Sequence, residues 1–124
     1  MSVFRAATFV LLCQGVTNVF ATQIIEMSLE EKSKLSDLVV IGKVASVSSE
    51  DCYRGSRCAK ILISSVLKGD SKGSITFLFD GPIHEFRPKC CEIGTTYLFF
   101  LERIDDARFR SMNGYFGVYS MGVP

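Results

Sequence analysis

Histidine is almost missing from this chain, since His84 is the only one in 124 residues. Histidine is the side chain most often used as a general base and is a common metal ligand, so its scarcity leaves few enzyme mechanisms open. The sequence also lacks the G-x-S-x-G turn of serine hydrolases and any local signature of a cysteine protease. His84 stands beside Glu85 in an expected loop, where a solvated surface residue is the simpler interpretation. We therefore predict a protein that is not an enzyme.

An excess of positive charge is missing as well. The chain has 14 basic and 13 acidic residues, and they form no blocks of like charge. Nucleic-acid-binding domains concentrate lysine and arginine to neutralise phosphates. The small cluster of Arg103, Arg108 and Arg110 is offset by neighbouring acidic residues. We therefore predict no nucleic-acid partner, although aromatic side chains that can stack on bases are present.

Long apolar runs are missing too. A membrane-spanning helix needs about 20 apolar residues, and the mostly apolar segment from Ala6 to Val16 is shorter. Arg5 precedes this segment, and small or apolar side chains precede a cleavage point after Ala21, which is the order of a secretory signal peptide. We predict a signal peptide over residues 1–21 and one domain over residues 22–124. The domain would be secreted or periplasmic, without stable membrane insertion after cleavage; a retained anchor is the alternative.

Cysteines are few but informative. Cleavage after Ala21 leaves four of the five, at Cys52, Cys58, Cys90 and Cys91. An even number in a small exported domain predicts two disulfides, and three connectivities are open. One pairing would close the loop between Cys52 and Cys58; alternatively, one or both of these reach Cys90 or Cys91. Adjacent residues in a strand point to opposite faces, so we expect Cys90 and Cys91 to take different partners.

Thiol chemistry is the alternative interpretation of Cys90 and Cys91. With His84 they could form a soft-metal site, or Cys91 and His84 could act as nucleophile and base. Adjacent cysteines, however, lack the C-x-x-C spacing that brings two sulfurs to one tetrahedral ion. We therefore predict structural disulfides, and neither a metal nor another cofactor.

One short helix is predicted, within residues 22–36. Ser28 and Glu31 have the spacing of a capping box, in which each side chain satisfies a free backbone N–H of the first turn. Leu29, Lys32 and Leu35 give the helix a short amphipathic face. The helix is expected to end near Ser36 or Asp37.

Strands follow the helix. Alternating or β-branched segments predict them at residues 37–49, 59–69, 73–81, 94–103, 107–112 and 115–121. The segment 94–103 is apolar on both faces and should be central. Asn113 and Gly114 both accept positive φ and predict a two-residue hairpin turn between the last two strands. These features predict a mainly β fold, a small five- to six-stranded antiparallel barrel of OB type with one short N-terminal helix.

The order of these segments resembles that of netrin-type modules. The segments that carry the resemblance are SDLVVIGKVASVSS, AKILISSVLKGD, ITFLFDGP and CEIGTTYLFFL, over residues 36–103. The superfamily includes the tissue inhibitors of metalloproteinases and many small uncharacterised exported proteins, and the resemblance implies an OB-type five-stranded barrel. Those inhibitors present an N-terminal cysteine to the zinc of a protease. The predicted mature chain begins at Thr22 and has no cysteine before Cys52, so that mechanism is not implied here.

Two loops are the candidate contact surfaces, because binding residues concentrate on loops held by a rigid scaffold. The candidate binding residues are His84, Phe86 and Arg87 in the first loop, and Tyr115 and Phe116 at the expected hairpin tip. We predict a non-enzymatic, protein-binding or inhibitor-like module with an unknown partner and oligomeric state. The alternatives are a soft-metal or thiol-redox protein using Cys90 and Cys91, and a structural component of an envelope or matrix.

Overall fold

The computed structural model describes residues 24–50, 52, 56–81 and 87–121. Its elements, in chain order, are α2 (Leu29–Leu35), β1 (Leu38–Ser48), β2 (Arg57–Lys68), β3 (Ser74–Asp80), β4 (Thr96–Arg103), β5 (Arg108–Ser111), the 3-10 helix η2 (Gly114–Phe116) and β6 (Val118–Ser120). The predicted signal peptide and two candidate binding residues, His84 and Phe86, lie outside the described residues.

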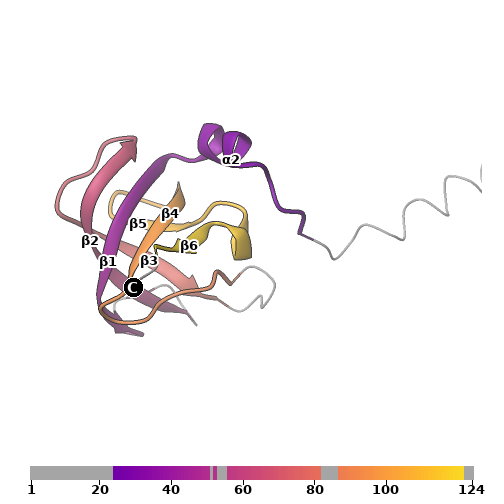
Figure 1. The fold of residues 1–124 in the computed structure, drawn as a ribbon. Helices are drawn as coiled ribbons and strands as arrows, with labels where there is room; N and C mark the ends of the chain where they lie inside the picture. Colours follow the sequence, from indigo (N-terminus) through magenta and orange to yellow (C-terminus); the bar gives the residue numbers. More distant parts are fainter. Residues whose placement is uncertain (1–23, 51, 53–55, 82–86, 122–124) are drawn as a thin grey trace, which may run out of the picture.

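Five strands close into a ring in the order β1–β2–β3–β5–β4, and β4 pairs back with β1 (Figure 1). The mainly β barrel of OB type with one short helix is thus confirmed. One detail of the prediction is wrong: β3 and β5 pair in parallel, whereas the other ring pairings are antiparallel. A barrel of mixed strand directions results, because β5 lies between β4, with which it pairs antiparallel, and β3, with which it pairs in parallel.

The helix follows its capping signal. Ser28 accepts a hydrogen bond from the backbone N–H of Glu31 at 3.1 Å, and the helix ends at Leu35, as predicted. Ser36 closes the end, because its backbone N–H and hydroxyl both donate to the carbonyl of Lys32. Lys68 at the end of β2 donates to the carbonyls of Ser33 and Lys34. These bonds fix the last turn of α2 against the barrel.

The barrel interior is filled by alternate residues of the strands. Ile75, Phe77 and Phe79 point inward from β3, which confirms the predicted period of two. Phe77 meets Phe99 of β4 edge to face, with ring centroids 5.1 Å apart. The rest of the buried cluster consists of Leu38, Val40, Val44, Ala59, Ile61, Tyr97, Leu101, Phe109 and Val118. Burying each such large side chain contributes roughly 1.5–3 kcal/mol, so this interior is the main source of stability.

The β1–β2 hairpin is strongly coiled. Its register shifts at three points, which leaves Leu67, Ser64 and Ala45 as extra residues without a partner across the ladder. Bulges of this kind bend a strand and increase its twist, which a small closed barrel requires. Gly42 leaves no room for a side chain between the two strands, since a Cβ there would be 2.5 Å from Ile61 Cγ2 and 2.9 Å from the carbonyl oxygen of Leu62.

Strand β4 is central, as predicted. One edge pairs with β1, and the other pairs with β5 and then with β6. Its inward residues include Phe99 and Leu101, while Phe100 points outward and is nevertheless buried. Phe100 lies outside the ring, where its ring meets Tyr119 of β6 edge to face and the ammonium of Lys32 of α2.

Candidate functional site

The candidate site is built on a short insertion, residues 113–116, between β5 and β6. Both strands pair with the same edge of β4. The Met112 N–H donates to the Phe100 carbonyl, and the Phe100 N–H donates to the Gly117 carbonyl, each at 2.8 Å. The chain therefore leaves the ladder after Met112 and returns at Gly117. The predicted two-residue hairpin at Asn113 and Gly114 is wrong, because β5 and β6 are successive parts of one interrupted strand.

The insertion is internally bonded. Asn113 and Gly114 have positive φ values of 70° and 52°, as the Asn-Gly sequence suggested, but they start the 3-10 helix η2. The Phe116 N–H donates to the Asn113 carbonyl at 3.0 Å, and the hydroxyl of Ser111 donates to the Gly114 carbonyl at 2.6 Å. Four consecutive residues outside the ladder thus keep one defined conformation.

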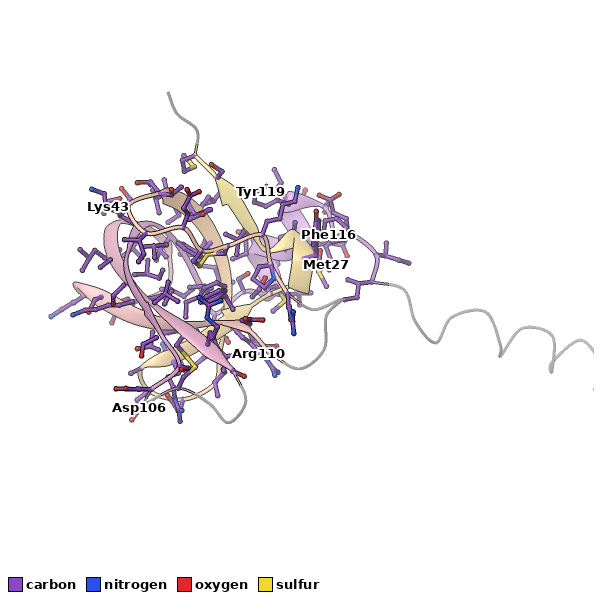
Figure 2. All side chains as sticks on the ribbon, turned by 90° about the horizontal axis from the view of Figure 1, so that it is seen from below. Met27, Lys43, Asp106, Arg110, Phe116 and Tyr119 are labelled. Carbon is purple, nitrogen blue, oxygen red and sulfur yellow. A yellow bond between two sulfur atoms is a disulfide. The ribbon has the colours of Figure 1, made fainter. Side chains whose placement is uncertain are left out.

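The N-terminal arm, residues 25–28, is docked on the insertion. The side-chain amide of Asn113 donates to the carbonyl of Ile25 at 3.0 Å and accepts from the N–H of Met27 at 2.8 Å. This is the two-bond pattern by which one strand pairs with another, supplied here by a side chain. The hydroxyl of Tyr119 adds a bond of 3.3 Å to Glu26. Figure 2 shows Met27, Phe116 and Tyr119 on the same side of the molecule.

Lys32 of α2 is completely buried beneath the insertion. Its ammonium donates to the carbonyl of Phe116 at 2.6 Å and to the hydroxyl of Tyr119. It also lies 5.5 Å from the ring centroid of Phe100 and 4.8 Å from that of Tyr119, which is cation–π geometry. Hydrogen bonds and aromatic faces therefore replace the water that a buried ammonium loses.

The predicted amphipathic face of the helix is wrong in its composition. Leu29 and Leu35 are 60% and 56% exposed, whereas Lys32 between them is the buried residue. Lys32 and Ser36, the residue that caps the C-terminal end of α2, are both buried. A lysine rather than a leucine is buried here because the Phe116 carbonyl needs a hydrogen-bond donor, which a leucine side chain does not have.

Tyr115 projects from the insertion toward solvent, with 42% of its surface exposed. Its ring meets that of Phe116 at an interplanar angle of 78°, with centroids 5.2 Å apart. The ammonium of Lys89 lies 5.6 Å from the centroid of Tyr115. The structure therefore brings two predicted binding residues, Tyr115 and Phe116, next to the segment that contains Cys90 and Cys91.

Arg87, the remaining described binding candidate, has a local role. Its Nε donates to the carbonyl of Gly81 at 2.9 Å and lies 3.1 Å from a carboxylate oxygen of Asp80. Asp80 also pairs with Arg57 at 3.5 Å. These contacts hold the chain at the end of β3, and they do not join Arg87 to Tyr115.

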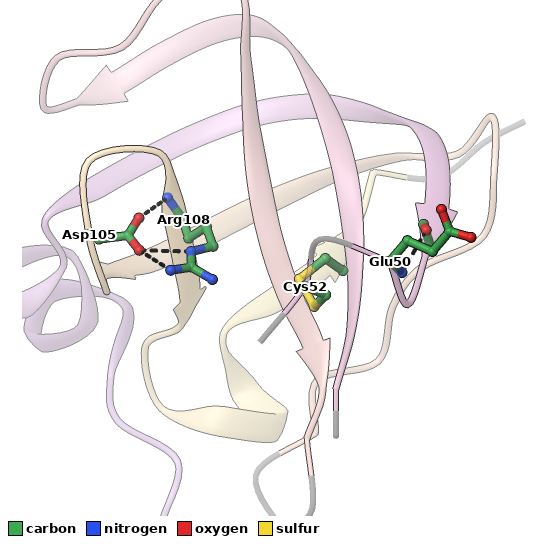
Figure 3. Close-up of a disulfide and its surroundings, with 6 residues drawn as sticks. Glu50, Cys52, Asp105 and Arg108 are labelled. Carbon is green, nitrogen blue, oxygen red and sulfur yellow. Dashed lines mark hydrogen bonds and ion pairs between the residues drawn. A yellow bond between two sulfur atoms is a disulfide. The ribbon is translucent and has the colours of Figure 1, made fainter. Parts of the chain in front are cut away.

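Both expected disulfides are present. Cys52 pairs with Cys58 across the loop between β1 and β2, with Cα atoms 5.6 Å apart (Figure 3). Cys90 pairs with Cys91, and their Cα atoms are 3.0 Å apart across a cis peptide bond. The expectation that the adjacent cysteines take different partners is therefore wrong. The segment lies in a loop before β4 rather than in a strand, so the opposed directions of neighbouring strand side chains do not apply.

The Cys52–Cys58 bond is expected to contribute measurably to stability. Replacing both cysteines by serine removes a constraint on the unfolded chain across six residues, so the free energy of unfolding should fall by about 2 kcal/mol. Urea denaturation of the variant and the parent, both oxidised, measures this difference. If the variant were as stable as the parent, the predicted contribution of this disulfide, which assumes that it restricts the unfolded chain, would be wrong.

Two arginines of the basic cluster near β5, Arg108 and Arg110, pair with acidic neighbours. Asp105 accepts from the Nε of Arg108 at 2.7 Å, and Arg110 pairs with Glu102 at 2.6 Å (Figure 3 shows the first pair). The side-chain hydrogen bond from Arg108, together with backbone N–H groups, holds the pKa of Asp105 below its ordinary value. The acid thus remains ionised and paired with its arginine.

Within the described residues, no group of three or more histidine, cysteine, aspartate or glutamate side chains is arranged to hold a metal ion. No helix in the same part of the chain is both long and apolar enough to cross a membrane. The chain matches no protein-family model, and no curated protein is significantly similar to it. The resemblance to netrin-type modules therefore stays a prediction.

Proposed function

We propose that the chain is an exported, non-enzymatic module that binds another protein through Tyr115 and its surroundings. Two disulfides are compatible with an oxidising compartment. A short signal-like N-terminal segment supports export. The proposed contact surface consists of Tyr115, Phe116 and Lys89, which are joined by a ring–ring and a cation–π contact.

The observation that carries this proposal is an exposed tyrosine on a rigid support. Lys32 of α2 and Ser111 of β5 donate to carbonyls of the insertion, and Asn113 bonds the insertion to the N-terminal arm, so Tyr115 stands on a backbone that is already ordered. Binding therefore costs little additional conformational entropy. Tyrosine is also enriched among residues that dominate interface energies, because its large ring carries a polar end.

The resemblance to netrin-type modules is consistent with a binding role, and it extends our proposal to inhibitor-like activity. The zinc-binding mechanism of the metalloproteinase inhibitors is not part of this proposal, because the predicted mature chain starts at Thr22 rather than at a cysteine. Residues 25–28 are instead bonded to the chain's own insertion. A partner would accordingly meet the insertion and Lys89.

The test replaces Tyr115 by alanine and by phenylalanine. A photo-activatable cross-linker placed at Lys89 of the otherwise natural protein should capture one recurrent partner from the secreted or periplasmic fraction. We expect Tyr115→Ala to weaken binding of that purified partner roughly 30-fold or more, since a central aromatic anchor is worth about 2 kcal/mol or above. Tyr115→Phe keeps the ring and should retain most of the affinity.

Circular dichroism and thermal unfolding check that both variants remain folded, which is expected because Tyr115 is solvent-exposed. Equal affinities of the natural protein and Tyr115→Ala would contradict the assignment of Tyr115 as an anchor. Repeated capture at native concentration without a recurrent partner would contradict the binding function itself.

A further inference from the structure

We propose that the Cys90–Cys91 disulfide is a thiol–disulfide exchange site, which a dithiol reduces while the barrel stays folded. The partner chemistry is a dithiol, either a small molecule or a pair of cysteines in another protein. This inference is independent of the proposed binding function, because it concerns the state of two sulfur atoms and is measured on them directly.

The exchange is balanced by the dithiol alone. One thiolate of the dithiol attacks the sulfur of Cys90 or Cys91, forms a mixed disulfide and releases the other cysteine as a thiolate, which takes up a proton. The second thiol of the reductant, as a thiolate, then attacks the reductant's own sulfur in the mixed disulfide, closes a disulfide in the reductant and releases the remaining cysteine as a thiolate, which also takes up a proton. The chain gains two electrons and two protons, and the dithiol loses the same.

Access distinguishes this disulfide from the other one. Cys90 and Cys91 are each half-buried, with one side against the core cluster and the other toward solvent. In the other disulfide, Cys52 is likewise half-buried, whereas Cys58 is buried in β2 with 6% of its surface exposed. An attacking thiolate must approach a sulfur in line with the bond that breaks, so either cysteine of Cys90–Cys91 is open to attack, whereas in the other disulfide only Cys52 is.

The segment around the pair is held by bonds that do not involve sulfur. Before it, Arg87 is bonded to the Gly81 carbonyl. After it, the Glu92 N–H donates to the hydroxyl of Tyr97 at 3.0 Å, and the Gly94 N–H donates to the Val44 carbonyl at 2.8 Å. Both ends of the loop therefore remain attached to the barrel when the disulfide opens.

The ring closed by this disulfide is also the smallest that a chain can form. Cys90 and Cys91 are one position apart, whereas Cys52 and Cys58 are six apart. A disulfide stabilises mainly by restricting the unfolded chain, and this effect grows with the length of the loop it closes. Opening Cys90–Cys91 therefore releases almost no chain entropy in the unfolded state, and the fold does not depend on it.

The experiment titrates the oxidised, folded protein with dithiothreitol, alkylates free thiols at each concentration and maps them by mass spectrometry. We expect Cys90 and Cys91 to be alkylated at about tenfold lower dithiothreitol than Cys52 and Cys58. At that concentration the near-ultraviolet circular dichroism and the thermal transition should be unchanged. Phenylarsine oxide, which bridges two neighbouring thiols, should then bind the reduced protein with a stoichiometry of one.

The matched variants are Cys90→Ser/Cys91→Ser and Cys52→Ser/Cys58→Ser. The first should fold with an unchanged thermal transition and no longer react with dithiothreitol at the low concentration; the second should keep the easily reduced pair. Alkylation of all four cysteines together, in parallel with unfolding, would overturn the proposal. So would peptide mapping that links Cys90 or Cys91 to either of the other two cysteines.

Discussion

Replacing Lys32 by alanine is expected to lower the free energy of unfolding by about 3 kcal/mol, although lysine is usually a surface residue. The substitution leaves an empty space between Phe100 and Tyr119, and it removes the donor to the Phe116 carbonyl. In a domain of this size, such a loss lowers the melting temperature by roughly 12–24 °C. Chemical and thermal denaturation of the oxidised protein measure both quantities.

Two further variants separate the contributions of Lys32. Lys32→Met keeps most of the apolar volume and removes the hydrogen bonds and cation–π contacts of the ammonium, so a smaller loss of about 1–2 kcal/mol is expected. Lys34→Ala changes an exposed lysine of the same helix and should alter stability by less than about 0.5 kcal/mol. If Lys32→Ala and Lys34→Ala were equally mild, the burial of Lys32 would be disproved.

Replacing Gly117 by alanine is expected to cost about 2–3 kcal/mol, because the strand re-enters the ladder at a point without room for a side chain. A Cβ at this position would overlap the hydroxyl oxygen of Ser111 and the carbonyl oxygen of Met112. The hydroxyl cannot turn away freely, since it donates to the Gly114 carbonyl. The insertion would shift as a whole, and urea denaturation should report the loss.

Gly81→Ala is the matched control, because the same methyl group is added where space is available. A Cβ there meets its nearest neighbour, the hydroxyl oxygen of Ser56, at 3.8 Å. The control should therefore be neutral or slightly stabilising. Destabilisation of Gly117→Ala should also be partly relieved by adding Ser111→Ala, which removes one of the two overlaps. Identical stabilities of the two glycine variants would refute the close approach at Gly117.

Much of the barrel was predictable from local patterns. The alternation of Ile75, Phe77 and Phe79 predicts a half-buried strand, and the apolar faces of residues 94–103 predict a central one. The capping pair Ser28 and Glu31 predicts where the helix begins. These features are encoded within a few residues of each other, so the sequence reveals them without the fold.

The parallel pairing of β3 with β5 was not predictable in this way. Strand direction within a pair depends on the path of the chain between elements, and two short segments of alternating residues look the same in either direction. The interrupted strand β5–β6 was missed for a related reason. Asn113 and Gly114 accept positive φ in a hairpin turn and at the start of a 3-10 helix alike. The two structures differ in whether the following segment pairs with β5 or with β4, and here it pairs with β4.

The site residues missed by the sequence are Lys32 and the side chain of Asn113. Both act on residues more than 80 positions away, and no sequence motif indicates these long-range contacts. A lysine between two leucines suggests an exposed position. Its hydrogen-bond partner in the fold is the backbone carbonyl of Phe116, and because every residue has such a carbonyl, the sequence does not indicate that Lys32 is buried. The Cys90–Cys91 pairing also depended on the loop conformation before β4 rather than on cysteine count.

Because the ammonium of Lys32 is buried, its rate of chemical labelling can measure how often the structure around it opens locally. Amine-reactive reagents can acylate lysines such as Lys34 in the intact protein, because that side chain is exposed, but they reach Lys32 only after α2 and the arm have left the insertion. The ratio of the two labelling rates therefore measures the free energy of this local opening, separately from global unfolding. A partner that binds the insertion would slow acylation of Lys32 in proportion to its occupancy.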